Sequence, residues 1–337
     1  MIASRILILA PHPDDEIVAC GIAAMRARED GAGVFVLYLT TGVPEVHAPR
    51  RYADRVRRRR DEALAVAALL EIKPVGFRDT PARRSRCDLP RALEDVAAAI
   101  ARCDGNMLWV PAFEGAHQDH DATNALAAML TSRLPVWEFA AYNLAGGKVR
   151  SNRFPTIRGG EVVITASEAE AARKRAAIAV YASERGNLRQ VAATQETARP
   201  LPRYDYGSAP HAGRLFRERF HWLPFRHPRI DFLPSEQLYR ELGAFASAAT
   251  IAAFEPAPRG EARQSDGKFA GALDEAERQR CVERDAGDGG QGDEACLLGA
   301  PAARDQKGGA AGGEAEAFEQ RRLLDAGRRT HQIERQP

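Results

Sequence analysis

A short apolar segment that ends in a cluster of acidic residues limits what this chain can fold into. Ile6–Leu9 is apolar, rich in strand formers and too short for a helix, so it is predicted to be a buried strand. A helix is predicted to follow and to run to about Asp30, with the acids in its first turn. The residues between are Pro11, His12, Pro13, Asp14, Asp15 and Glu16.

Acidic residues at a helix N-terminus often have a simple explanation, because carboxylates there cap the helix and favour its dipole. Three adjacent acids beside a histidine go further than this explanation requires, since like charges this close repel one another unless a cation compensates. Carboxylate and imidazole are ligand types that zinc takes. The cluster therefore favours a metal site over helix capping alone.

A second strand with a polar end supplies the rest of the site. Met107–Val110 is predicted to be a strand, and the loop after it carries His117, Asp119 and His120. His12, Asp15 and His120 make a set of two histidines and one carboxylate, which suits a divalent metal. Asp14 and His117 remain as charged groups beside the metal that are not needed as ligands.

These two motifs resemble the signature of the PIG-L/LmbE-like zinc-dependent N-deacetylases. In that family a strand leads into Pro-His-Pro-Asp-Asp-Glu and a distant His-x-Asp-His follows, as at residues 11–16 and 117–120 here. The resemblance covers roughly residues 3–245. It implies that His12, Asp15 and His120 hold zinc, that Asp14 is the general base, and that His117 assists at the oxyanion.

The chemistry of these residue types agrees with that implication. Three protein ligands leave a coordination position for water, and zinc lowers the pKa of such a water to about 7. Asp14 can take a proton from the water, and a protonated His117 can stabilise the oxyanion. Asp119 is expected to orient His117 or a ligand histidine. Glu16 either does the same or favours the helix start.

Two substrate contacts are also considered: Thr41, because its strand ends near the metal loop if the two strands are neighbours, with an ordinary turn as the alternative, and Asp79, because of the resemblance. Thr41 lies at the end of a predicted strand at 34–39, and Asp79 lies shortly after one at 75–77. Family members often place an acidic residue near the second position against sugar hydroxyls, and an arginine from the basic stretch 50–60 in the pocket. Which of the arginines at 55–60 this is stays open at the level of sequence.

Alternating strands and helices predict an α/β fold, with a Rossmann-like, mainly parallel sheet flanked by helices. Residues 1–250 are expected to form the catalytic domain. Residues 251–337 are rich in glycine and poor in large apolar side chains, so they are predicted to be a largely disordered tail. Further helices are expected at 50–70, 89–102, 122–130, 167–184 and 236–249, and further strands at 136–142 and 161–165, with a possible strand at 214–222.

Composition narrows the partners. The net charge of +2 implies no global field for nucleic acid. No apolar run reaches the roughly 18 residues needed to span a membrane, and the N-terminus does not resemble a signal peptide. Five cysteines without a C-x-x-C pair favour reduced thiols. A cytoplasmic location and a small-molecule substrate are therefore predicted.

The predicted function is metal-dependent removal of an N-acetyl group from an amino sugar, such as N-acetylglucosamine, or from its glycoside or conjugate. Zn²⁺ is the expected cofactor, with Fe²⁺ as the alternative. A zinc amidase that cleaves a larger amide, such as a sugar–thiol conjugate, would use the same residues. A non-haem iron oxygenase is disfavoured because it needs no flanking base, and an arginine-rich binding protein with a structural metal is disfavoured because structural zinc usually has four protein ligands.

Overall fold

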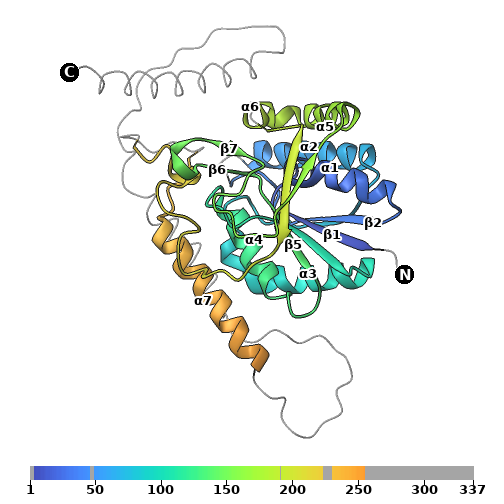
Figure 1. Ribbon diagram of the computed structural model, residues 1–337. Helices are drawn as coiled ribbons and strands as arrows, with labels where there is room; N and C mark the ends of the chain where they lie inside the picture. Colours follow the sequence, from blue (N-terminus) through green and yellow to red (C-terminus); the bar gives the residue numbers. More distant parts are fainter. Residues whose placement is uncertain (1–3, 46–48, 190, 223–229, 255–337) are drawn as a thin grey trace, which may run out of the picture.

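The main sheet of the protein is mixed and lies between two layers of helices (Figure 1). The computed structural model describes residues 4–45, 49–189, 191–222 and 230–254. Within them the main sheet has seven strands in the order β3-β2-β1-β4-β5-β9-β8, and β6 and β7 form a separate hairpin. The strands are β1 Arg5–Ala10, β2 Gly33–Tyr38, β3 Lys73–Phe77, β4 Met107–Pro111, β5 Val136–Phe139, β6 Tyr142–Asn143, β7 Arg150–Ser151, β8 Val162–Thr165 and β9 Gln195–Pro200.

Helices cover both faces of the sheet. The core on one side joins β1 and β2 to α1, α2 and α5, and the core on the other side joins the same strands to α3, α4 and α7 (Figure 1). Both faces of the central strands are therefore buried, as parallel sheets require. The helices are α1 Asp15–Glu29, α2 Pro49–Leu69, α3 Leu89–Cys103, α4 Gln118–Ala128, α5 Glu168–Val180, α6 Arg185–Leu188 and α7 Ser235–Phe254.

The strand order brings the two sequence motifs together. Strands β3, β2, β1, β4 and β5 are parallel, and the direction in which successive strands are added reverses between β1 and β4. In open α/β sheets this reversal leaves a crevice at the carboxyl ends of the strands, where ligands bind. Because β1 pairs directly with β4, the loops after Ala10 and Pro111 begin side by side. The predicted α/β class with a mainly parallel sheet is confirmed.

The far edge of the sheet differs from the prediction. Strand β9 was not predicted, because Gln195–Pro200 contains no apolar run, yet it lies between β5 and β8 and is antiparallel to both. Its charged side chains are buried because each has a charged partner. Arg199 bonds to Glu138 on β5 at 2.7 Å, and Glu196 bonds to Lys174 on α5 at 2.7 Å.

Several predicted boundaries were also wrong. The helix expected to begin at residue 122 begins at Gln118, because the His117 side chain caps it. The strand expected at 136–142 stops at Phe139, and the helix expected at 167–184 ends at Val180. Its predicted capping box, Ser167 with Glu170, is confirmed. The stretch 214–222 holds a short 3-10 turn instead of a strand.

Helix α1 is interrupted at Cys20, and two buried charged side chains from other elements bond to the backbone groups that the interruption leaves unpaired. Cys20 has a non-helical backbone with φ −139°. The backbone N–H groups of Ile22 and Ala23 donate to the Glu196 carboxylate at 2.8 and 3.0 Å. The freed carbonyl of Val18 accepts a hydrogen bond from Lys174 Nζ at 3.1 Å. The groups left unpaired by the break are thereby satisfied, as buried backbone requires.

Three further predictions concern the rest of the chain. Cys20 and Cys103 are free thiols as expected. In the described part of the chain, no helix combines the length and apolar character needed to cross a bilayer. The tail predicted to be disordered lies, from residue 255 onwards, outside the described residues.

Lys174→Met should destabilise the protein by about 3–5 kcal/mol, because it leaves the buried Glu196 carboxylate without its charged partner. Urea unfolding followed by circular dichroism measures the loss. Arg175→Met, on the exposed side of the same helix, is the matched control and should change stability by less than about 0.5 kcal/mol. A loss below about 1 kcal/mol for Lys174→Met would contradict the capping role of the Lys174–Glu196 pair.

Candidate metal centre

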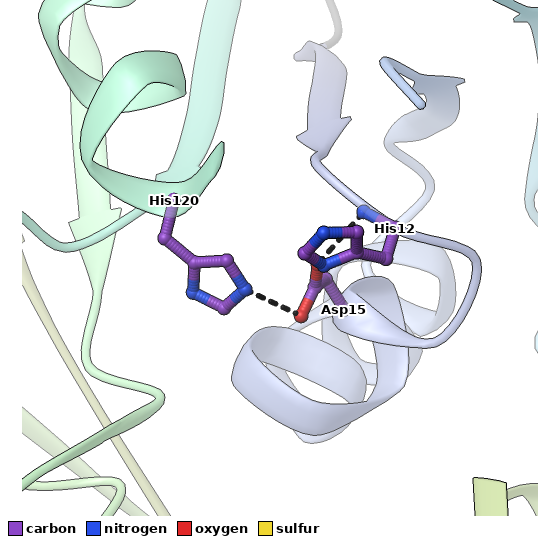
Figure 2. A group of neighbouring side chains, drawn as sticks. All are labelled: His12, Asp15 and His120. Carbon is purple, nitrogen blue, oxygen red and sulfur yellow. Dashed lines mark hydrogen bonds and ion pairs between the residues drawn. The ribbon is translucent and has the colours of Figure 1, made fainter. Parts of the chain in front are cut away.

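Three of the predicted ligands converge at the carboxyl ends of β1 and β4. His12 lies in the loop after β1, Asp15 begins α1, and His120 projects from the first turn of α4 toward them (Figure 2). Asp15 lies between the two imidazoles: its Oδ2 is 3.1 Å from His12 Nδ1, and its Oδ1 is 3.2 Å from His120 Nε2. All three residues are at least nine-tenths buried.

These distances suit a tetrahedral cation. Two ligands at about 2.1 Å from a zinc ion and a tetrahedral angle apart lie about 3.4 Å from each other, close to both separations at Asp15. His120 adds a second observation, because both of its ring nitrogens are buried and neither forms a hydrogen bond within the described residues. A buried imidazole without hydrogen bonds is costly. A metal ion would give the His120 ring a ligand bond, where it now has only the ion pair with Asp15.

A second set of possible ligands overlaps the first. His12, His117 and Asp119 also bring ligand atoms close together. However, the Nδ1 atom of His117 already accepts a hydrogen bond from the Asp119 backbone N–H at 3.1 Å. The Asp119 carboxylate already accepts hydrogen bonds from the backbone N–H groups of Arg83 and Ser85, at 2.6 and 3.2 Å. The set of His12, Asp15 and His120 therefore fits a metal better.

Within the set of His12, Asp15 and His120, neighbouring side chains strongly affect the pKa of His12 and of Asp15. Burial lowers the pKa of His12, but hydrogen bonds with Asp119 and Asp15 outweigh burial and raise that pKa to about 10. Burial would raise the pKa of Asp15, but the two histidines hold it well below the usual range. The acids thus draw positive charge into the site, and a bound cation would replace the proton on His12.

Asp14 adopts an uncommon backbone conformation beside this set. Its φ of 139° is unusual for a residue other than glycine and costs of order 1–3 kcal/mol. The Arg59 guanidinium holds its carboxylate, with Nη2 at 3.2 Å from Oδ2, and also bonds to the Pro13 carbonyl and the Glu184 carboxylate. Burial raises the pKa of Asp14 well above its ordinary value, although Arg59 opposes the shift.

Glu16 supports Asp14 from the other side. One oxygen of its fully buried carboxylate accepts the Asp14 backbone N–H at 3.1 Å, and the other accepts the Tyr181 hydroxyl. Glu16 thus holds the residue at the N-cap of α1, and its role in the site stays a prediction.

The surroundings of His117 favour the neutral form of its imidazole. Burial and the neighbouring His12 lower the pKa of His117 to about 3, in contrast to the protonated form expected from sequence. Because Nδ1 accepts the backbone N–H of Asp119, the ring hydrogen resides on Nε2. A neutral His117 can therefore still donate one hydrogen bond from Nε2.

Asp119 contacts His12, one of the predicted ligands, and lies farther from His117. Its Oδ2 is 3.0 Å from His12 Nε2 and 3.7 Å from His117 Nδ1. With Nδ1 of His12 toward Asp15 and Nε2 toward Asp119, the imidazole ring is fixed at both ends. Such a carboxylate behind a ligand histidine sets its orientation and basicity.

The two predicted substrate contacts lie in the loops after β2 and β3. Thr41 is buried, and its hydroxyl bonds within its own loop to the Val43 carbonyl at 3.1 Å and lies 3.2 Å from the Tyr52 hydroxyl. Asp79 is exposed, two residues beyond β3. In the described part of the chain, neither forms a hydrogen bond with the ligand set, so their roles stay predictions.

Sequence reasoning missed two residues near the site and left a third unresolved. The resemblance suggested an arginine at 55–60 without saying which one, and Arg59 is the buried arginine of that stretch. Tyr181 lies in a stretch that resembles the family, but no role was predicted for it. Tyr142 was predicted only as the end of a strand, although its ring centroid lies 5.5 Å from that of His120.

Comparison with known proteins matches the segment that builds this site. Residues 7–130 match the PIG-L family model, described as GlcNAc-PI de-N-acetylase. This part of the chain is similar to that family. A curated relative, 2'-N-acetylparomamine deacetylase of Streptomyces fradiae, is 31% identical over 134 residues, which cover 34% of this chain. The match spans about half of that relative, 48% of its length.

Solved structures are similar to this chain at lower identity. A deacetylase of the teicoplanin biosynthesis pathway has a TM-score of 0.48 and 22% identity, covering 58% of this chain and 97% of its own. The 4-carboxy-2-hydroxymuconate hydratase from Pseudomonas putida has a TM-score of 0.42 and 18% identity, covering 60% of this chain and 98% of its own.

His120→Ala should weaken Zn²⁺ binding by more than about a hundredfold, because loss of a ligand exceeds the 10–100-fold typical of an outer partner. Competition with a chromophoric chelator measures the affinity. His211→Ala, which removes a histidine outside the ligand set, is the control and should bind Zn²⁺ as the wild type does. Unchanged affinity in His120→Ala would remove His120 from the site.

Proposed function

We propose that the chain is a metal-dependent hydrolase that removes the N-acetyl group from an N-acetylated amino sugar, or from a glycoside or conjugate of one. The convergence of His12, Asp15 and His120, with Asp14 and His117 beside them, carries the proposal. The family description, a de-N-acetylase, and the deacetylase relative support the reaction class. We propose residues 1–250 as the catalytic domain. Acetyl is the acyl group that we propose is removed.

Zn²⁺ is the proposed metal, with Fe²⁺ as the alternative, because two histidines and a carboxylate suit either ion. His12, Asp15 and His120 would hold it. When bound, the metal supplies a water of lowered pKa and polarises the amide carbonyl. The remaining chemistry belongs to side chains of this chain.

Asp14 is the proposed general base. In its ionised form, its carboxylate accepts a proton from the attacking water and later delivers it to the leaving nitrogen. Arg59 favours the ionised form and holds the carboxylate in place. Because a group that accepts and then donates a proton works best with a pKa near the working pH, the opposing effects of burial and Arg59 suit this task.

His117 is the proposed donor to the oxyanion. Its neutral imidazole donates from Nε2, and Nδ1 is fixed by the N–H of Asp119 at the start of α4. A preorganised donor of this kind contributes about 3–4 kcal/mol when charge develops on the carbonyl oxygen. The donor needs no protonation, so the expected activity does not require an acidic pH.

The rival functions are less well supported. An oxygenase would have no use for Asp14 and the arginine that holds it. A nucleic-acid-binding role for the basic helix α2 is weakened by internal pairing. Arg57 pairs with Asp54 and Arg58 with Glu62 on the same helix, and Arg59 is directed inward. An amidase for a sugar–thiol conjugate would use the same residues and is not favoured by any specific feature.

Asp14→Asn should lower kcat by about a hundred- to ten-thousandfold while Zn²⁺ affinity stays within a few-fold, because the base is lost but the ligands remain. Acetate release from N-acetylated amino sugars and glycosides by Zn²⁺-loaded protein is the measurement. Asp104→Asn is the matched control, since Asp104 is exposed and has a left-handed backbone that asparagine also tolerates. Normal turnover in Asp14→Asn would exclude Asp14 as the base.

If no member of a broad panel of N-acetylated sugars releases acetate, the proposed deacetylase function is wrong even if the metal site is right. Zinc binding, measured separately, distinguishes these two outcomes.

A further inference from the structure

An arginine lies next to the candidate metal centre without a described carboxylate partner. The Tyr142 ring packs 5.5 Å from the His120 ring, and the Phe216 ring packs 4.8 Å from Tyr142, measured between centroids. The Arg219 guanidinium lies over Phe216, with Cζ 3.8 Å from the ring centroid. A continuous stack of side chains thus leads from a candidate metal ligand to a guanidinium.

The charge of Arg219 is poorly compensated. Among the residues that the structure describes, it forms no ion pair, and its guanidinium donates to the Phe216 carbonyl at 3.0 Å. The faces of Phe216 and Phe220 offer cation–π contacts, with Cζ at 3.8 and 4.6 Å from the ring centroids. Burial and the like charge of Arg83 together lower the pKa of Arg219 to about 10, against an opposing effect of Tyr142. A buried arginine usually has an anionic partner.

Tyr142 lies between this arginine and the candidate metal ligands. Its ring packs against His120 on one side and against Phe216, which carries the Arg219 guanidinium, on the other. A phenol hydroxyl and a guanidinium are both hydrogen-bond donors. The stack therefore offers two kinds of donor close to the candidate ligands.

We propose that Arg219 and the Tyr142 hydroxyl form a subsite for an anionic group of the substrate, a phosphate or a carboxylate. A planar guanidinium laid on a ring keeps edge donors for two oxygens of one anion. The inference rests on the proposed function, because it assigns the charge of the same substrate whose N-acetyl group is hydrolysed. It makes Arg219 a specificity-determining residue.

Calorimetric titration of the Zn²⁺-loaded full chain tests this. The probes are N-acetylglucosamine, which is neutral, N-acetylglucosamine 1-phosphate and N-acetylmuramic acid, which carries a carboxylate. The wild type should bind at least one anionic sugar about ten- to a hundredfold more tightly than the neutral sugar, the range for a charge-assisted hydrogen bond. The preferred anion identifies phosphate or carboxylate as the ligand.

Arg219→Gln should abolish the preference, and Arg175→Gln, an exposed arginine on α5, should keep it. Equal binding of neutral and anionic sugars by the wild type, or an unchanged preference in Arg219→Gln, overturns the subsite. Tyr142→Phe is a second variant, should Arg219→Gln fail to fold. It should reduce the preference by a few-fold, and an unchanged preference in Tyr142→Phe also counts against the subsite.

Acetate release from the same samples separates the two proposals. An Arg219-dependent preference without acetate release supports the subsite and contradicts deacetylation of these sugars. Acetate release without any preference for charge supports deacetylation and removes the subsite.

Discussion

The structure depends on the pairing of carboxylates that are buried at the end of one strand. Desolvated charges are stable only with partners that hold them. Asp14 has Arg59 from α2, Asp15 has two histidines, and Glu16 has the Tyr181 hydroxyl from the end of α5. Arg59 and Tyr181 come from α2 and the end of α5 on one side of the sheet, whereas His120 comes from α4 on the other side. The acidic motif therefore joins α1 to helices on both sides of the sheet.

The same pairing explains why the reactive groups are rigid. Asp14 has a strained backbone conformation, and such conformations persist only where the surroundings determine them fully. Here Glu16 holds its backbone N–H, and Arg59 holds its carboxylate. Gly42 lets the neighbouring loop approach closely, since a Cβ there would lie 2.8 Å from Pro13. The metal set and the proposed base are thus placed by contacts outside the motif itself.

Whether a residue of the site could be predicted from the sequence depends on the local pattern in which it occurs. His12, Asp15 and His120 could be found because rare residue types recur at the ends of two apolar strands, and such strands are predicted well by their pattern. Glu196 and Arg199 could not, because they are charged residues in a strand that is buried only through pairs formed across the sheet. Arg219 and Tyr142 also gave no local signal, since their importance arises from packing against His120 and Phe216.

The repair of α1 links residues that are far apart along the chain. Lys174 bonds to Val18 across 156 positions, Tyr181 to Glu16 across 165, and Glu196 to Ile22 across 174. At a synthesis rate of about 5–20 residues per second, roughly ten to thirty seconds pass between the synthesis of α1 and the synthesis of these partners. The acidic motif is therefore synthesised well before the residues that complete its contacts.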